Sequence, residues 1–222
     1  ANLKFIILII LIYILLKLSD NLLIENLYLG SLNYTIYLHD YSIFFTILCF
    51  LLFINACNMY DGINLQLGPY FIFIFIIFLF KLKLILFSVV IIIPLLVFCY
   101  LNFNGKIFIG NSGAYFLSFL IAYICIKQNN LRMNISPEEI FLIMSIPGLD
   151  MFRLFIHRIL SKKNPFSADR RHLHHYVIDI FDERKAQIII FFLNVLPFFI
   201  YQFYKSIYVP IISIATYFVI YF

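Results

Sequence analysis

Long apolar runs recur along the chain, and they constrain its fold more than any other feature. The 222 residues are 64% hydrophobic and 12% charged, with a mean hydropathy of +1.00. A soluble domain of this length needs a polar surface, which such a composition does not supply. The runs are continuously apolar and lack the alternation of a membrane β-barrel. We therefore predict an all-α fold, a polytopic transmembrane helical bundle.

The apolar runs predict about eight membrane spans within one integral-membrane domain that covers residues 1–222. An apolar run begins almost at the first residue, Ala1, so we expect the chain to be truncated at its N-terminus. Several runs are shorter than the ~20 residues that cross a bilayer comfortably. The predicted spans are residues 4–18, 40–56, 69–80, 84–101, 114–126, 140–158, 187–204 and 207–222.

Basic residues are enriched in alternate loops, which orients the bundle. The loops at residues 57–68, 102–113 and 158–187 hold more Lys and Arg than the loops on the opposite side. The positive-inside rule places these three loops in the cytoplasm. Loops on one face of a bundle can converge on one site. The net charge of +5 flanks membrane spans and forms no soluble basic face, so we expect no nucleic-acid partner.

The first polar motif, NACNMYDGIN at residues 55–64, follows an apolar span directly. Asp61 sits at the membrane boundary, where a carboxylate is costly unless it is paired or bound to a metal. Asn58 and Asn64 add oxygen donors, and oxygen ligands suit magnesium. An equal alternative is a helix cap followed by an Asp-Gly turn.

The second motif, NGKIFIGNSGA at residues 104–114, lies just before another apolar span. Glycines bracket Asn111 and Ser112, so backbone N–H groups at the helix start can cradle a phosphate. Without other context, a tight turn capped by Ser112 is the simpler interpretation.

The third motif is SKKNPFSADRRHLHHYV, which runs from Ser161 to Val177. Its histidines can bind a metal, donate to phosphate or shuttle a proton. A zinc site made of His172, His174 and His175 is an alternative. In the preceding apolar run, Asp150 lies three residues before Arg153, so the two can pair on one helical face.

Taken together, the three motifs resemble those of the polyprenyl-phosphate N-acetylhexosamine-1-phosphate transferases, of the glycosyltransferase family 4 type. The matching segments are NACNMYDGIN, IFIGNSGAYFLSFLIAY and PGLDMFRLFIHRILSKKNPFSADRRHLHHYV, in the family's order and spacing. The resemblance implies transfer of a sugar 1-phosphate from a UDP-sugar to undecaprenyl phosphate, with release of UMP. Such a reaction starts a cell-surface glycan, for example an O-antigen.

The resemblance also implies a set of site residues and partners. The partners are UDP-N-acetylhexosamine, undecaprenyl phosphate and the lipid bilayer of a bacterial inner membrane, with the active site on the cytoplasmic side; a homodimer is a further option. The metal is Mg²⁺ or Mn²⁺. The implied catalytic residues are Asp61, His172, His174 and His175; the substrate-binding residues are Asn58, Asn64, Lys106, Asp169 and Arg171, with Asp169 orienting a histidine; the metal ligands are Asp61 and Asn111.

The chain departs from the family pattern at several positions. The family's acidic Asp-Asp pair in an earlier loop is not found in this sequence, and its magnesium-binding Asp is Asn111 here. Ala114 replaces a Ser, and Asn64 stands where some members have Asp. These departures favour a catalytically impaired scaffold as one alternative. A membrane transporter, with Asp150, Arg153 and His157 along its path, is another.

Overall fold

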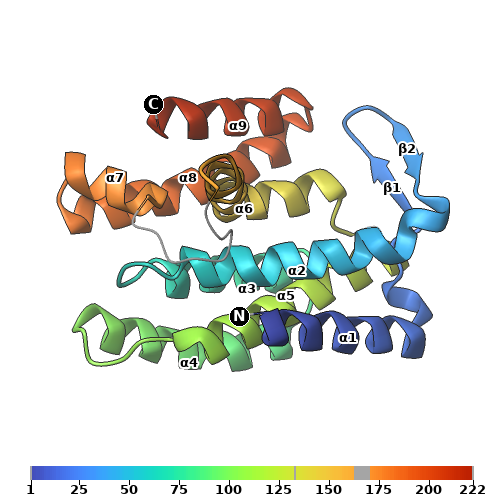
Figure 1. Cartoon of the computed structure of the whole chain (residues 1–222), viewed down its shortest axis with the longest axis horizontal. Helices are drawn as coiled ribbons and strands as arrows, with labels where there is room; N and C mark the ends of the chain where they lie inside the picture. The colour runs from blue at the N-terminus through green and yellow to red at the C-terminus, as the bar shows by residue number, and fades with distance from the viewer. Residues whose placement is uncertain (1, 133, 163–170, 222) are drawn as a thin grey trace.

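The computed structural model describes residues 2–132, 134–162 and 171–221. These ranges contain nine α-helices and one β-hairpin (Figure 1). The helices are α1 (Asn2–Leu18), α2 (Ser42–Tyr60), α3 (Leu67–Phe80), α4 (Ile85–Phe103), α5 (Gly110–Arg132), α6 (Pro137–Leu160), α7 (Leu173–Ile180), α8 (Glu183–Tyr204) and α9 (Tyr208–Tyr221); the strands are β1 (Asn26–Leu29) and β2 (Tyr34–Tyr37).

Each of the eight predicted spans coincides with a helix, but the count of about eight membrane spans is not confirmed. Four helical segments are long and apolar enough to cross a membrane: His39–Tyr60, Ile85–Phe103, Pro137–Leu160 and Glu183–Tyr204. The 14-residue helices α3 and α9 are only about 21 Å long, whereas a hydrocarbon core is about 30 Å thick. The described part of the chain is thus all-α, with four helical segments long enough to cross a membrane and several shorter apolar helices.

The core forms where α2 and α3 meet their neighbours. Helix α2 packs against α5 and α6, and α3 packs against α4. Helix α3 buries the aromatic rings of Phe71, Phe75 and Phe78 completely. Helix α4, by contrast, exposes large apolar side chains along its length, including Leu86 and Val97. An outward apolar face of this kind suits contact with lipid tails.

Helix α6 bends in its middle, which positions the residues after the bend. Pro147 lies inside the helix, and a proline removes one backbone hydrogen bond and clashes with the preceding turn. The ribbon changes direction part-way along α6, and its second half points toward the viewer in Figure 1. That half carries Asp150, Arg153 and His157, and it packs near α8 and α9.

The hairpin and the start of α6 close one end of the molecule, and the sequence did not predict this hairpin. The backbone N–H and the hydroxyl of Ser31 both donate to Glu138 Oε1, at 3.0 and 2.9 Å. Glu139 closes a capping box with Ser136, and Lys205 Nζ donates to its Oε1 at 3.1 Å. The same carboxylate also contacts Lys81.

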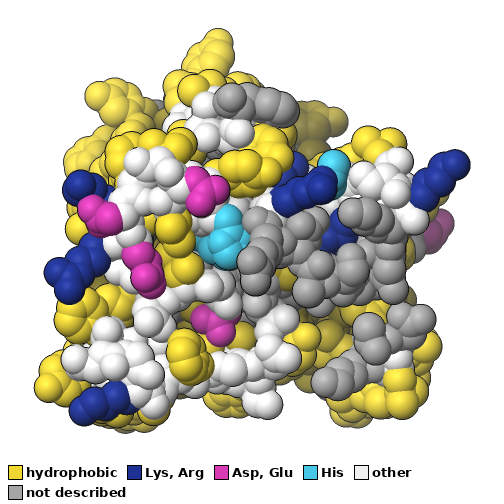
Figure 2. All heavy atoms as spheres, turned by 60° about the vertical axis from the view of Figure 1, so that its left-hand side comes forward, with side chains coloured by type: hydrophobic (Ala, Val, Ile, Leu, Met, Phe, Trp, Pro, Cys, Tyr) yellow, Lys and Arg dark blue, Asp and Glu magenta, His cyan; other side chains and the backbone are white. Residues whose placement is uncertain are grey.

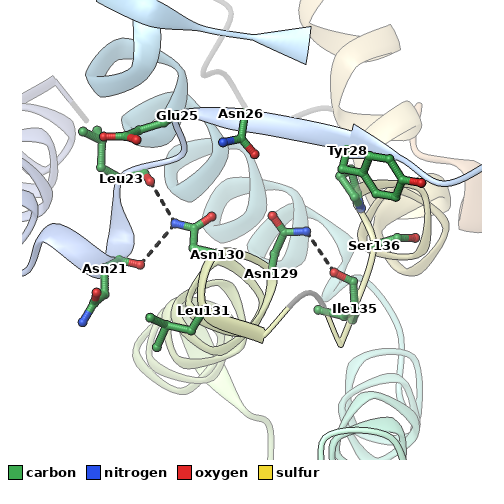
Figure 3. Close-up of a pocket in the computed structure, with 11 residues that line it drawn as sticks. Asn21, Leu23, Glu25, Asn26, Tyr28, Asn129, Asn130, Leu131, Ile135 and Ser136 are labelled. Carbon is green, nitrogen blue, oxygen red and sulfur yellow. Dashed lines mark hydrogen bonds between the residues drawn. The ribbon is translucent and has the colours of Figure 1, made fainter. Parts of the chain in front are cut away.

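A polar pocket of about 250 Å³ lies beside this hairpin, between the chain after α1 and the end of α5 (Figure 3). Asn130 Nδ2 donates to the carbonyl oxygens of Asn21 and Leu23, at 3.1 and 2.9 Å. Asn129 Nδ2 donates to the Ile135 carbonyl at 2.9 Å. These bonds tie α5 to the chain on both sides of the pocket. Figure 1 places this end of the molecule opposite the loops that follow α2 and α4.

Candidate functional site

The first motif ends α2 and turns the chain. Helix α2 stops at Tyr60, and the Gly62 N–H donates to the Tyr60 carbonyl at 2.9 Å in the predicted turn. Asp61 is partly open to solvent, but neighbouring protein atoms displace part of the water around its carboxylate. This desolvation raises the pKa of Asp61 above its ordinary value. A cation nearby would therefore stabilise its charged form.

The second motif lies against the first. Asn58 Nδ2, in the last turn of α2, donates to Asn111 Oδ1 at 3.2 Å. Asn111 is in the first turn of α5, which begins at Gly110, a residue with a φ of +65°. A glycine adopts that left-handed conformation without strain. The positive end of the α5 dipole therefore lies next to the loop that holds Asp61.

Buried Asn102, which sequence reasoning missed, connects these two loops. Its Oδ1 accepts from the Leu65 N–H at 2.7 Å, and its Nδ2 donates to the Ile107 carbonyl at 2.8 Å and to Asn64 Oδ1 at 3.3 Å. The Asn64 carbonyl also accepts from Gln187 Nε2 at 2.8 Å. One amide thus satisfies groups from both loops. A polar residue in the last apolar turn before a loop is the signal that could have identified it.

Replacing Asn102 with alanine should loosen both loops at once. Two backbone groups, the Leu65 N–H and the Ile107 carbonyl, would lose their side-chain partner, at about 0.5–1.5 kcal/mol for each hydrogen bond. We expect a lower melting temperature in detergent and a weaker site. Asn104→Ala is the matched control, because Asn104 is exposed and donates only to the Tyr100 carbonyl among the bonds described. Equal melting temperatures for the two variants would contradict the role of Asn102.

The third motif reaches the first through His174. His172 precedes α7 as its N-cap residue, and His174 lies in the first turn, 3% exposed. The His174 ring packs so closely on Gly62 that a Cβ at Gly62 would overlap it. The ring also stacks on His172, with centroids 5.3 Å apart and planes 6° apart. Segments more than 100 residues apart in sequence therefore share one surface.

The described histidines do not form a three-ligand group that could hold a metal ion. Burial, and then the neighbouring His175 and His172, lower the pKa of His174 to about 3, so its ring is neutral at physiological pH. Within the described ranges, no group of three or more His, Cys, Asp or Glu side chains could hold a metal ion. The zinc alternative is therefore not supported. Face-to-face stacking keeps the ring nitrogens of His172 and His174 from converging on one ion.

A buried carboxylate on α6 contacts this histidine cluster. Asp150 is 5% exposed, and Arg153 Nη2 donates to its Oδ1 at 2.8 Å, so the predicted i,i+3 pair is confirmed. The contact that the sequence did not reveal is with His172, whose Nδ1 lies 3.0 Å from Asp150 Oδ2. We expected Asp169 to orient a histidine; Asp169 lies outside the described residues. The sequence feature that could have pointed to the contact between Asp150 and His172 was a carboxylate inside an apolar run.

The remaining predicted residues are Arg171, His175 and Lys106, of which His175 contacts the histidine cluster directly. Arg171 is exposed, and its guanidinium donates to His157 Nε2. His175 is half-buried, and its ring centroid lies 4.3 Å from that of His174. Lys106 is exposed in the loop before α5, and within the described residues no hydrogen bond or ion pair joins its side chain to the other predicted residues. Figure 2 shows acidic, basic and histidine side chains together on this face.

The oxygen donors of the first two motifs fit magnesium better than a softer metal. Magnesium takes oxygen ligands, often one or two carboxylates completed by substrate phosphates and water. Asp61 supplies a carboxylate, and the Asn58–Asn111 contact places amide oxygen atoms at the start of α5. The replacement of a family Asp by Asn111 removes one charge from this set, so we expect weaker metal binding.

Comparison with known proteins places the chain in a family. The family model described as glycosyl transferase family 4 matches residues 1–129, more than half of the chain. The chain belongs to glycosyl transferase family 4. The matched residues include the first two motifs of the site. The histidine motif lies beyond them.

Several curated relatives share a name. A protein of Escherichia coli O157:H7, undecaprenyl-phosphate alpha-N-acetylglucosaminyl 1-phosphate transferase, is 28% identical over 183 residues, 74% of this chain and 50% of that protein. The protein of the same name from Salmonella typhi is 29% identical, over 76% of this chain and 51% of its own length. The one from Yersinia pestis is 28% identical, over 62% of this chain and 41% of its own length. The chain thus spans about half the length of the curated relatives it matches. No solved structure matches it.

Proposed function

We propose that this family 4 protein transfers an N-acetylhexosamine 1-phosphate from a UDP-sugar to undecaprenyl phosphate and releases UMP. The observation that supports this best is the meeting of three distant motifs on one face. Asn58 bonds to Asn111, and Gly62 packs against His174. The names of the curated relatives point to the same lipid acceptor and sugar phosphate.

The reaction joins two anions, so charge and alignment set its barrier. An oxygen of the lipid phosphate attacks the β-phosphorus of the UDP-sugar, the bond from that phosphorus to the bridging oxygen breaks, and the electron pair leaves with UMP. A magnesium or manganese ion held by Asp61 and the amide oxygen of Asn111 would neutralise the diphosphate. The N-terminus of α5 adds a positive dipole end beside it.

The histidine cluster and Arg171 would hold the sugar nucleotide. Neutral His174 can donate one hydrogen bond, and exposed Arg171 adds a permanent positive charge next to His157. In this proposal the face shown in Figure 2 lies at the cytoplasmic surface of a bacterial inner membrane. The exposed apolar side chains of helices such as α4 contact the lipid tails. The product would start a cell-surface glycan.

The direct test is an assay of UMP release. The purified protein in detergent, given UDP-N-acetylglucosamine, undecaprenyl phosphate and Mg²⁺, should release UMP and form a lipid-linked product. Omission of the lipid should stop both. Release of no UMP under conditions where the protein is folded and binds the lipid would favour the scaffold alternative. Movement of solute across vesicles without consumption of UDP-sugar would favour the transporter.

Restoring a carboxylate at position 111 should strengthen the metal site. Asp at this position keeps the oxygen that accepts from Asn58 and adds one negative charge. We expect Asn111→Asp to bind Mg²⁺ at least ~10-fold more tightly, since a charged ligand replaces a neutral one. Calorimetry of Mg²⁺ binding measures this without turnover. Asn104→Asp adds the same charge at the end of α4, within the same motif but outside the site; a similar gain there would overturn the assignment of Asn111.

A further inference from the structure

The two carboxylate oxygens of Asp150 have different hydrogen-bond partners. Oδ1 accepts from Arg153 Nη2 at 2.8 Å, from the Leu173 N–H at 3.0 Å and from the Tyr217 hydroxyl at 3.0 Å. Oδ2 faces His172 Nδ1 at 3.0 Å. A helix-locking ion pair with Arg153 would need only the first of these bonds. The remaining bonds reach two other elements, α7 and α9.

The same network holds three consecutive residues at the start of α7. Arg153 Nη2 donates to the Arg171 carbonyl, Asp150 accepts from the His172 ring, and it also accepts from the Leu173 backbone N–H. The bent second half of α6 therefore fixes the backbone on both sides of His172 as well as its ring. The orientation of the first turn of α7, which contains His174, depends on these bonds.

The Asp150 contact also selects one tautomer of His172. A carboxylate can only accept, so Nδ1 must carry the hydrogen. In the neutral ring, Nε2 then bears the lone pair, at the opposite edge of the imidazole from Asp150. A carboxylate that fixes the tautomer and tilt of a histidine is a recurring support for a functional imidazole.

Two tyrosines of α9 hold in place the side chain of Arg153, which is the ion-pair partner of Asp150. Arg153 Nε donates to the Tyr217 hydroxyl at 2.7 Å. The guanidinium centre lies 3.9 Å from the centroid of the Tyr221 ring, close enough for a cation–π interaction. Arg153 cannot leave Asp150 without losing these contacts. The negative charge of Asp150 is therefore compensated at a fixed place, and Oδ2 remains directed at His172.

We propose that Asp150 is a positioning residue of the transfer site, which acts through His172 by fixing its Nδ1–H tautomer and by anchoring the start of α7. The proposal rests on the proposed function, since it places His172 in the sugar-nucleotide site. Asp150 itself contacts no substrate. Its effect on transfer passes through the histidine that it holds.

The first test needs no substitution at Asp150. Histidine labelled with ¹⁵N in the full chain, in lipid nanodiscs at alkaline pH, reports which ring nitrogen carries hydrogen, and a His172→Gln spectrum assigns the signal. We expect a protonated Nδ1 and an unprotonated Nε2. A protonated Nε2, or one signal averaged over both tautomers, would overturn the proposal. This readout does not depend on turnover, so a chain that releases no UMP but shows the expected tautomer refutes only the proposed function.

The second test is a double-mutant cycle on UMP release. Asp150→Asn keeps the shape but presents an amide to His172, and we expect kcat to fall about 100-fold. In a His172→Ala background, the same substitution should cost little more, because its effect passes through the histidine. Full additivity of the two losses would mean that Asp150 acts on the fold alone.

Tyr217→Phe is the matched control. It removes one donor to Asp150 Oδ1 and the acceptor of Arg153 Nε, and it leaves the contact between Oδ2 and His172. We expect a loss of about tenfold or less. If Asp150→Asn and Tyr217→Phe lower kcat equally while melting at the same temperature, general loosening of the network explains both, and the positioning role is wrong.

Discussion

Asp61→Asn should abolish magnesium-dependent transfer with almost no change in the fold. The substitution keeps the size and shape of the side chain at the end of α2 but removes the carboxylate charge of the proposed metal site. Loss of metal-assisted charge stabilisation costs several kcal/mol in the transition state, which corresponds to about 1000-fold in rate. UMP release at saturating substrate measures the loss, and calorimetry should show weaker Mg²⁺ binding.

Asp182→Asn provides the comparison for this charge change. Asp182 is the exposed N-cap residue of α8 and accepts from the Lys185 N–H at 2.9 Å. Asparagine is as good an N-cap residue as aspartate, so this variant removes one negative charge without loss of the cap. We expect activity close to that of the unmodified protein. Near-normal activity of Asp61→Asn would remove Asp61 from the site.

Gly62→Ala should lower transfer at least about 100-fold, because a single added methyl group displaces His174. The new Cβ would overlap the imidazole. The ring has little room to move, since it is buried and packed against His172 and His175. Overpacking of this kind typically costs about 1–3 kcal/mol of stability. UMP release and the melting temperature should therefore both decrease.

Two further variants separate the clash from other effects of the added methyl group. Gly148→Ala adds the same group inside α6, where nothing lies within 4 Å of the new Cβ, and should be neutral. The double variant Gly62→Ala/His174→Ala removes the clash, because the imidazole is gone. Its melting temperature should therefore fall by less than the sum of the decreases in the two single variants. Its activity should stay low. Strict additivity of the melting temperatures would contradict the packing of His174 on Gly62.

Local patterns in the sequence were sufficient to locate eight of the nine helices in the described residues. Each predicted apolar segment lies on a helix, and the Asp150–Arg153 pair follows directly from i,i+3 spacing. The number of membrane spans cannot be derived from the sequence in the same way. An apolar run of 14 residues such as α3 predicts a helix, but its length does not determine whether that helix crosses the bilayer. The roles of Asp61, Asn111 and the histidines remain predictions.

Contacts between distant segments were not accessible from local patterns. Asn102 bonds to Leu65, 37 residues away, and His172 bonds to Asp150, 22 residues away. No periodicity encodes either pair, since both depend on how whole helices pack. Helix α7 was also missed, because eight residues within a basic loop resemble an irregular segment. The hairpin between β1 and β2 was missed for a related reason, since its strands have only four residues each.

The neutral state of His174 has a consequence for how this face would hold its ligand. An uncharged imidazole attracts phosphate through one directed hydrogen bond, and mobile ions in the medium hardly weaken such a bond. The guanidinium of Arg171, in contrast, lies exposed, where counterions at about 0.15 M screen its field within about 8 Å. Ionic strength should thus alter how fast a nucleotide arrives more than how it is oriented once it is in place.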